Sequence, residues 1–193
     1  MRSVCVFCGS SDGIRPAYRA AAERMAAALV RRGLRLVYGG GRVGLMGTLA
    51  NATLAAGGEV IGVIPEALVS KELAHRGVSD LRVVGTMHER KALMADLSDG
   101  FVTLPGGFGT LEEFLEVLSW AQLSIHAKPC GLLDIEDYYG PMIELFDRAV
   151  IEGFVVPDHR ALVLTERDPD LLLDLMERYT PPITKKWIES QER

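Results

Sequence analysis

Cysteine and long apolar stretches are both scarce in this sequence. Only three cysteines occur among 193 residues, and Met1 leads into a strand-like stretch without the apolar core and cleavage site of a secretory signal. A sparse, odd set of cysteines without such a signal is typical of a reduced, cytoplasmic protein. No apolar run approaches the roughly 18 residues that a membrane-spanning helix needs. We therefore expect a cytoplasmic protein with no membrane partner.

Positive charge is also scarce. The net charge is -5 and the isoelectric point is near 5.4, and the basic residues are scattered apart from Lys185 and Lys186. Proteins that bind nucleic acid usually carry a basic face, so nucleic acid is not an expected partner. A small anion remains compatible with this composition, because helix N-termini and one or two cations can hold a phosphate in an acidic protein.

Metal and redox chemistry find little support. Cys5 and Cys8 have the CxxC spacing, but a second pair of ligands is missing. A three-residue offset within a strand also directs the two thiols to opposite faces. We expect no metal and no cofactor.

What the sequence does contain is an ordinary globular mixture, with 48% hydrophobic and 24% charged residues and no internal repeat or linker. The length fits a single domain, residues 1–193. Seven short apolar runs lack polar alternation, as strands covered on both faces do. These runs are Val4–Cys8, Leu34–Tyr38, Val60–Ile64, Leu81–Val84, Phe101–Leu104, Cys130–Leu133 and Ala161–Leu164.

Helical patterns lie between the predicted strands. They cover Pro16–Arg32, Gly44–Ala56, Met87–Leu97, Leu111–Ser124, Tyr139–Ile151 and Pro169–Tyr179. Gly33 suits the position just after the first helix. The less periodic stretch Glu66–Ser79 is expected to be a loop with a short helix. This alternation predicts an α/β fold: a doubly wound, Rossmann-like, mostly parallel sheet of about seven strands flanked by helices.

Glycine-rich loops follow the predicted strands at Gly9–Gly13, Gly39–Gly47 and Pro105–Thr110. The second loop satisfies GxGxxG between a strand and a helix, which is typical of dinucleotide binding. This loop, however, follows the second predicted strand, whereas the dinucleotide-binding loop usually follows the first. That motif also needs an acidic residue at the end of the next strand, and Glu66 lies only near that position. Backbone N–H groups that approach an anion are the safer interpretation, and a tight turn that needs glycine is the alternative.

The third loop continues into a helix and includes Glu113. Thr110 is expected at the N-cap, and the glycines before it allow a phosphate to come close. The spacing of Thr110 and Glu113 also matches a capping box, so Glu113 has a purely structural interpretation beside a catalytic one.

Arg90 and Lys91 are adjacent cations near the same predicted sheet edge. Either a phosphate-binding pair or a solvated helix face explains them. The two glycine loops expected beside them favour phosphate.

These stretches together resemble the LOG ("lonely guy") family. Gly39–Gly47 is similar to its signature GGGxxGLMG and Pro105–Glu113 to PGGxGTxxE, and the resemblance extends to Cys8–Ser11, Met87–Lys91 and Trp120–Leu123. Members were long labelled possible lysine decarboxylases, but no lysine here is marked as a Schiff-base residue. The resemblance implies a cytokinin riboside 5′-monophosphate phosphoribohydrolase that often accepts AMP.

The resemblance also implies site residues. Arg90 and Glu113 fall on the family's catalytic positions. The substrate-contacting positions are Glu72, Arg90, Lys91, Gly107, Phe108, Gly109, Thr110, Leu111, Glu112, Glu113 and Ser119. We assign the phosphate to backbone amides around Gly40, Gly41, Gly106, Gly107, Gly109 and Thr110.

Cleavage of a ribosyl C–N bond develops positive charge on the sugar. Glu113 is expected to stabilise that charge and to orient or deprotonate water, while Arg90 positions the phosphate or the carboxylate. No convincing acid for the leaving base is apparent, although His88 is a candidate. A non-catalytic nucleotide sensor and an NAD-dependent oxidoreductase are the competing hypotheses.

The helix predicted at Leu111–Ser124 is apolar around most of its circumference, so we expect burial on more than one side. Neighbouring helices or a second subunit can provide that burial. The family resemblance favours a homodimer with Arg90 or Glu72 near the interface.

Overall fold

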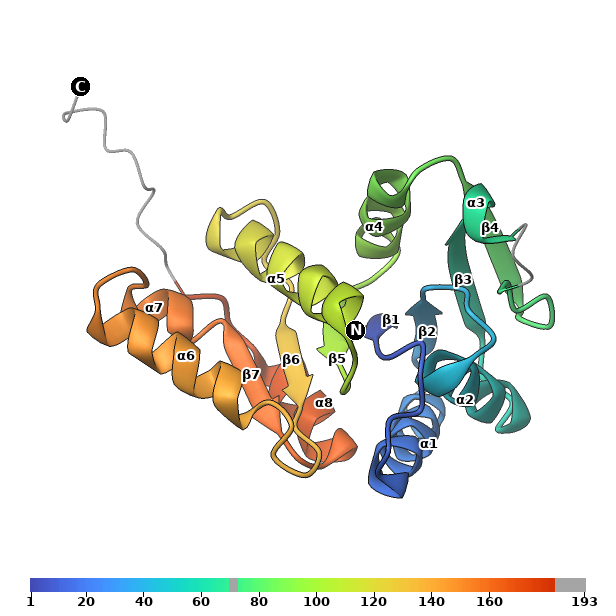
Figure 1. Cartoon of the computed structure of the whole chain (residues 1–193), viewed down its shortest axis with the longest axis horizontal. Helices are drawn as coiled ribbons and strands as arrows, with labels where there is room; N and C mark the ends of the chain where they lie inside the picture. The colour runs from blue at the N-terminus through green and yellow to red at the C-terminus, as the bar shows by residue number, and fades with distance from the viewer. Residues whose placement is uncertain (70–72, 183–193) are drawn as a thin grey trace.

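The computed structural model describes residues 1–69 and 73–182 (Figure 1). Seven strands form one sheet in the order β4-β3-β2-β1-β5-β6-β7, and every pairing between neighbours is parallel. The strands are β1 (Ser3–Phe7), β2 (Arg35–Tyr38), β3 (Val60–Pro65), β4 (Asp80–Val84), β5 (Gly100–Thr103), β6 (Cys130–Leu133) and β7 (Val163–Glu166). The predicted doubly wound α/β fold is confirmed.

Helices cover both faces of the sheet. They are α1 (Pro16–Arg31), α2 (Gly44–Ala55), α3 (Glu66–Val69), α4 (Met87–Asp96), α5 (Phe108–Gln122), α6 (Gly140–Ile151), α7 (Pro157–Arg160) and α8 (Pro169–Arg178). One apolar core lies between the sheet and α1, α2 and α8, and the other lies between the sheet and α4, α5 and α6 (Figure 1). Within the described residues, no helix is long and apolar enough to cross a membrane.

Successive side chains of strand β1 alternate between the two cores. Val4 and Val6 face the core of α1, α2 and α8, whereas Cys5 and Phe7 face the other one. Cys8 belongs to the first core, so the thiols of Cys5 and Cys8 lie on opposite faces of the sheet, as the strand spacing predicts. Burial raises the pKa of both thiols, which is opposite to what thiolate chemistry requires.

Most helix boundaries fall within one or two residues of the predicted ones, and Gly33 follows α1 with a φ of 65°. Helix α5 is the main exception, because it begins at Phe108 rather than at Leu111. Helix α7 has no counterpart among the predicted elements. Of the polar stretch that ends the sequence, residues 180–193, the structure describes only residues 180–182.

The sheet order places the candidate site. From β1 the chain moves to β2 on one side and later returns to β5 on the other side of β1. In doubly wound sheets, the loops that leave such a switch point diverge and leave a ligand crevice at the carboxyl ends of the strands. Here those loops follow β1 and β5, and both are glycine-rich.

Candidate active site

The three glycine-rich loops meet at this sheet edge. The Gly9 N–H donates to the Pro105 carbonyl at 3.1 Å, and the Met46 N–H donates to the Gly9 carbonyl at 3.3 Å. Gly44 has a φ of 60°, and a Cβ there would overlap the backbone of Ser10. Glycine at this position therefore permits the second loop to pack directly on the first.

A cavity of about 390 Å³ opens between the loops. Arg90, Glu113 and Thr110 contribute its polar wall, and Met46 and Leu68 are part of its apolar wall. This size and mixed lining suit a small molecule with an apolar part and a polar part.

Arg90 and Glu113 form an ion pair in that wall. Each residue is only 8% exposed, and Arg90 Nη1 lies 3.1 Å from Glu113 Oε1. Arg90 Nε also donates to the Val63 carbonyl at 3.1 Å, which ties the guanidinium to the end of β3. The Thr86 hydroxyl accepts from the Glu89 N–H and caps α4, the helix that carries Arg90.

Gly39 makes room for this arrangement. A Cβ at Gly39 would overlap Nη2 of Arg90, so even alanine would displace the guanidinium. Glycine at the first position of the second loop thus leaves space for the Arg90 side chain. The GxGxxG pattern alone does not indicate this role.

The surroundings of Glu113 change the pKa of its carboxyl group. Burial raises the pKa of this carboxyl above its ordinary value, and the Arg90 charge opposes that effect without cancelling it. Neighbouring Glu112 adds to the increase. A carboxylate with a raised pKa is a stronger base than a solvated glutamate, which suits it to accept a proton from water.

The prediction of Thr110 as N-cap is wrong, and the capping-box alternative for Glu113 fails with it. The N-cap of α5 is Gly107, whose backbone is extended, and no side chain caps the helix there. Thr110 therefore lies inside the first turn, and Glu113 lies beyond it, paired with Arg90. The first N–H groups of the helix, which begin at this glycine N-cap, have no partner within the helix. The structural interpretation of Glu113 as a cap is thereby removed.

The glycines assigned to phosphate differ in placement. Gly41, Gly107 and Gly109 line the cavity together with Phe108 and Thr110. Gly40 has a φ of 72°, and its carbonyl accepts from the His75 N–H at 2.9 Å. At Gly106, a Cβ would overlap Thr110 Oγ1. Both of these glycines shape the loops, whereas the other three border the space itself.

Some predicted contact residues lie away from the cavity lining. Lys91 Nζ is held by Glu112 and by Glu116, the latter at 2.9 Å, and these partners raise its pKa although burial opposes them. Ser119 is exposed and donates to the Leu115 carbonyl. Leu111 packs against the core below α5. Glu72 lies outside the described residues.

The structure adds residues that the sequence pattern does not identify. Cys8 and Ser10 line the cavity from the loop after β1, and Leu73 lines it from the stretch after α3. That stretch pairs with the second glycine loop, because Ala74 and Gly41 form an antiparallel bridge. Position directly after a strand was a usable signal for Cys8 and Ser10, but no pattern distinguishes Leu73.

Residues 46–176 match the family described as "Possible lysine decarboxylase". The chain is 53% identical over 180 residues to a probable cytokinin riboside 5′-monophosphate phosphoribohydrolase of Oryza sativa subsp. japonica, covering 93% of this chain and 79% of that protein. It is 53% identical over 168 residues to the cytokinin riboside 5′-monophosphate phosphoribohydrolase of Rhodococcoides fascians, covering 86% and 85%. A probable enzyme of the same description from Arabidopsis thaliana is 48% identical, with 93% and 90% covered.

Solved structures show the same fold at low sequence identity. The molybdenum cofactor binding protein of Rippkaea orientalis superposes with a TM-score of 0.70 at 19% identity, covering 92% of this chain and 97% of that one. The molybdenum cofactor carrier protein of Chlamydomonas reinhardtii gives a TM-score of 0.68, also at 19% identity, covering 92% and 96%. At this identity the likeness concerns the fold alone. Together with the relatives near 50% identity and the paired glycine signatures, the match over residues 46–176 shows that this chain belongs to the LOG family, whose members carry the older description of possible lysine decarboxylases.

Proposed function

We propose that this protein hydrolyses the N-glycosidic bond of cytokinin-type nucleoside 5′-monophosphates, releases the free base and ribose 5-phosphate, and also accepts AMP. The observation that carries this proposal is the buried Arg90–Glu113 pair, 3.1 Å apart, in the wall of a cavity bordered by glycine loops. The named activity of relatives near 50% identity supports it.

The phosphate is assigned to the start of α5. The N–H groups of Phe108, Gly109 and Thr110 precede the helix's own hydrogen-bond ladder, and the helix dipole favours an anion there. Because Phe108, Gly109 and Thr110 line the same cavity as Glu113, a phosphate bound at this end directs the ribose towards the carboxylate.

Glu113 supplies the chemistry in this proposal. As a carboxylate it stabilises the positive charge that develops on the ribose, and it accepts a proton from the attacking water. Arg90 holds the carboxylate in place and keeps a positive charge beside the phosphate region. His88 is exposed on α4 and is not among the described residues that line the cavity, so it is not placed to donate a proton to the leaving base.

The older family description fits the lysines poorly. The Lys91 amine is engaged by Glu112 and Glu116, and the Lys128 amine donates to the Ala95 carbonyl at 2.7 Å. Lys71 lies outside the described residues. A Schiff-base lysine needs a free, uncharged amine next to its substrate, and neither Lys91 nor Lys128 offers one.

Product analysis tests the proposal. Purified protein is incubated with a panel of nucleoside 5′-monophosphates, and ribose 5-phosphate and free base are measured. Stoichiometric release of both products is expected. Binding of AMP without release of adenine would instead favour a non-catalytic nucleotide sensor, and a nicotinamide-dependent absorbance change would favour an oxidoreductase.

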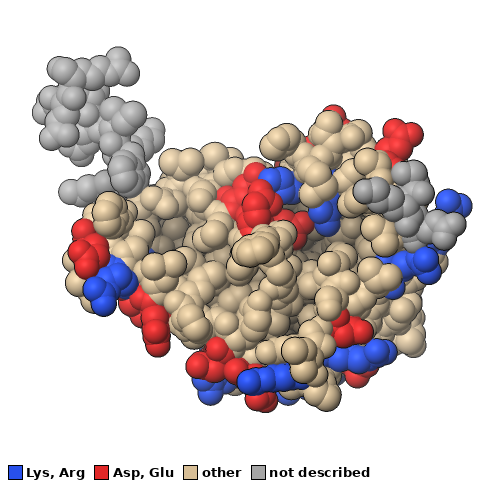
Figure 2. All heavy atoms as spheres, viewed as in Figure 1, with Lys and Arg blue, Asp and Glu red and all other residues tan. Residues whose placement is uncertain are grey.

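We further propose that the chain acts in the cytoplasm as a single catalytic domain, residues 1–193, in a homodimer whose sites lie near the interface. Phe108 is 93% exposed at the rim of the cavity, and Leu115 on the same helix is 42% exposed. Figure 2 shows a largely uncharged surface between a cluster of acidic and basic side chains over α5 and the charged groups along α6. A second copy on this face would bury Phe108 and Leu115 and cover the rim of the cavity.

Light scattering over a dilution series, read beside specific activity, tests the dimer. We expect a dimer whose dissociation by Leu115→Glu lowers activity. A wild-type monomer with full activity would contradict this part of the proposal.

A further inference from the structure

The loop between β6 and α6 reaches across to the glycine loop that follows β5. The Tyr139 hydroxyl donates to the Leu104 carbonyl at 2.7 Å, and the Tyr138 hydroxyl donates to the Gly106 carbonyl at 2.5 Å. These contacts span more than thirty residues of sequence, and neither tyrosine belongs to the two glycine signatures.

Three successive carbonyls are fixed in this way. Leu104 accepts from Tyr139, Pro105 accepts from the Gly9 N–H, and Gly106 accepts from Tyr138. The backbone that follows immediately is Gly107, the N-cap of α5. Because each peptide plane is rigid, fixing the carbonyl of one residue fixes the direction of the next N–H group. The Tyr138 hydroxyl, bound to the Gly106 carbonyl, therefore sets the direction of the Gly107 N–H at the start of the phosphate loop. The Tyr139 hydroxyl binds the Leu104 carbonyl, and the next residue, Pro105, has no N–H, so this bond holds the backbone that leads into the loop.

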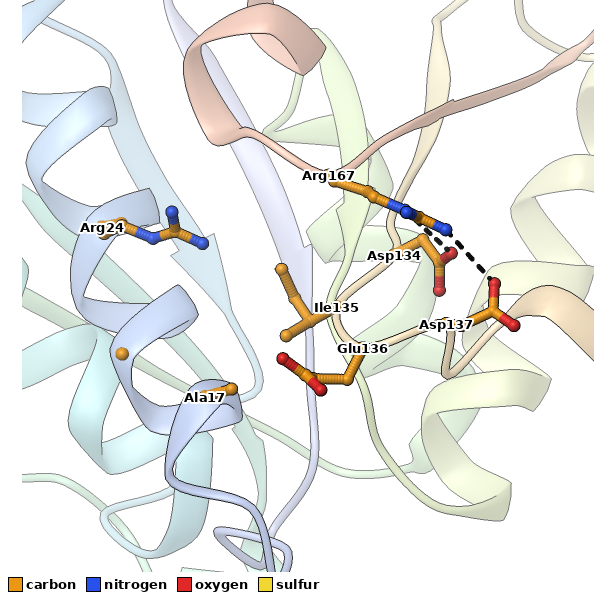
Figure 3. Close-up of a pocket in the computed structure, with 8 residues that line it drawn as sticks. Ala17, Arg24, Asp134, Ile135, Glu136, Asp137 and Arg167 are labelled. Carbon is orange, nitrogen blue, oxygen red and sulfur yellow. Dashed lines mark hydrogen bonds and ion pairs between the residues drawn. The ribbon is translucent and has the colours of Figure 1, made fainter.

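The tyrosine loop is itself anchored. The Tyr139 N–H donates to Asp134 Oδ1 at 2.8 Å, and the Asp134 side chain is only 5% exposed. Arg167 follows β7 and pairs with two carboxylates of this loop (Figure 3). Its Nε lies 3.9 Å from Asp134 Oδ2, and its Nη2 lies 3.4 Å from Asp137 Oδ1. Glu136 and Asp137 both have positive φ angles, so the loop holds a conformation that side chains seldom adopt.

The tyrosine rings add packing to these bonds. Tyr138 makes edge contacts with Tyr18 of α1 and with Tyr139, at centroid distances of 5.9 and 5.0 Å. Tyr139 is buried, whereas Tyr138 is 39% exposed. Removing the Tyr138 hydroxyl thus disturbs one hydrogen bond near solvent without opening the core.

We propose that Tyr138 and Tyr139 are positioning residues that hold the phosphate loop, through the Leu104 and Gly106 carbonyls, in the orientation that binds the 5′-phosphate. This inference rests on the proposed function, because it takes the start of α5 as the phosphate site. It assigns to a loop outside the glycine signatures a share in the preference for nucleotides over nucleosides.

The test compares Tyr138→Phe and Tyr139→Phe with the wild type and with Tyr18→Phe as the matched control. The control removes a hydroxyl from the same aromatic cluster, and that hydroxyl is not part of the proposed machinery. For Tyr138→Phe we expect the KM for AMP to rise about fivefold, the loss expected for one hydrogen bond, while kcat changes less than twofold. The low activity towards adenosine should not change, because adenosine lacks the phosphate.

Amide hydrogen exchange in the ligand-free proteins provides the second readout. Peptides that cover residues 104–111 should exchange faster in both phenylalanine variants than in the wild type and in Tyr18→Phe. Tyr139→Phe should also lower the melting temperature, because it leaves a buried carbonyl without its donor.

Two results would overturn the inference. One is unchanged exchange of residues 104–111 in Tyr138→Phe, and the other is an equal rise of KM in Tyr138→Phe and Tyr18→Phe. Absence of turnover by the wild type on every nucleoside monophosphate would instead contradict the proposed function. The exchange measurement needs no substrate, so in that case it still decides whether the tyrosines hold the loop.

Discussion

Glu113→Gln separates a catalytic carboxylate from a structural one, because it removes the charge and keeps nearly the same volume. Two effects on stability oppose each other. Arg90 loses the ion partner 3.1 Å away, and loss of one partner from a buried pair costs up to about 3–5 kcal/mol. The carboxylate whose burial raises its pKa is removed as well, and its desolvation cost disappears with it. We therefore expect a net destabilisation below about 3 kcal/mol, and a folded protein.

The expected loss of activity is much larger. Glu113 is proposed both to accept the proton of water and to stabilise the cationic sugar, and positioned acid–base groups contribute about 10²–10⁴-fold each. A fall of kcat by at least about 10³-fold with AMP is therefore expected. Ribose 5-phosphate release measures it, and circular dichroism with thermal melting verifies the fold.

Glu116→Gln is the matched control. Glu116 lies on the same helix, pairs with Lys91 at 2.9 Å and does not line the cavity. Its replacement should alter kcat by less than about threefold, as for a partly exposed ion pair worth less than about 1 kcal/mol. Turnover by folded Glu113→Gln within about tenfold of the wild type would refute the assigned role of this carboxylate.

Three further predictions follow from the same geometry. Because burial holds the pKa of Glu113 above its ordinary value and the carboxylate form is required, kcat should fall on acidification through that raised pKa. Removing the opposing charge in Arg90→Met should move this limb of the pH–rate profile to higher pH, and an unmoved limb would contradict the coupling. Gly39→Ala should displace the Arg90 guanidinium and lower kcat at least about tenfold with AMP, whereas wild-type kinetics would show that the pair tolerates the shift. Finally, kcat/KM for AMP should exceed that for adenosine at least about 100-fold, as two or more charge-assisted hydrogen bonds to phosphate require, and equal values would remove the phosphate role of the loop.

Much of the fold could be predicted from sequence because its strands are buried on both faces. Such strands give continuous apolar runs, as in Val60–Ile64, and each is followed by a helix with its own period. The first and last residues of the helices were less predictable. Helix α5 begins at Phe108 because an extended glycine can serve as N-cap, so the Thr110 pattern, which fits a capping box, pointed to the wrong residue.

The site was predictable where its residues lie in the loops that follow strands or in the first turns of the helices after those loops. Arg90 and Glu113 were identified as catalytic candidates, and contact with the Glu113 carboxylate was one of two roles expected for Arg90. Which role applies depends on how α4 and α5 approach each other across the sheet edge. Lys91 illustrates the opposite outcome, since its neighbour in sequence enters the cavity wall while its own amine turns to Glu112 and Glu116. Adjacent positions on a helix point about 100° apart, and sequence alone does not tell which of them faces the site.

The arrangement around Arg90 favours catalysis over a merely structural ion pair. A pair 8% exposed on each side carries a desolvation cost that well-packed apolar side chains would avoid. The surrounding structure nevertheless accommodates it with specific features: Gly39 leaves space for Nη2, the Val63 carbonyl accepts from Nε, and capped helix α4 carries the side chain to the wall. Burial raises the pKa of Glu113, the partner that is proposed to accept a proton. A sensor of nucleotides would need the phosphate-binding amides but not a buried carboxylate with a raised pKa in the cavity wall, so the position of Glu113 favours the proposed bond cleavage over binding alone.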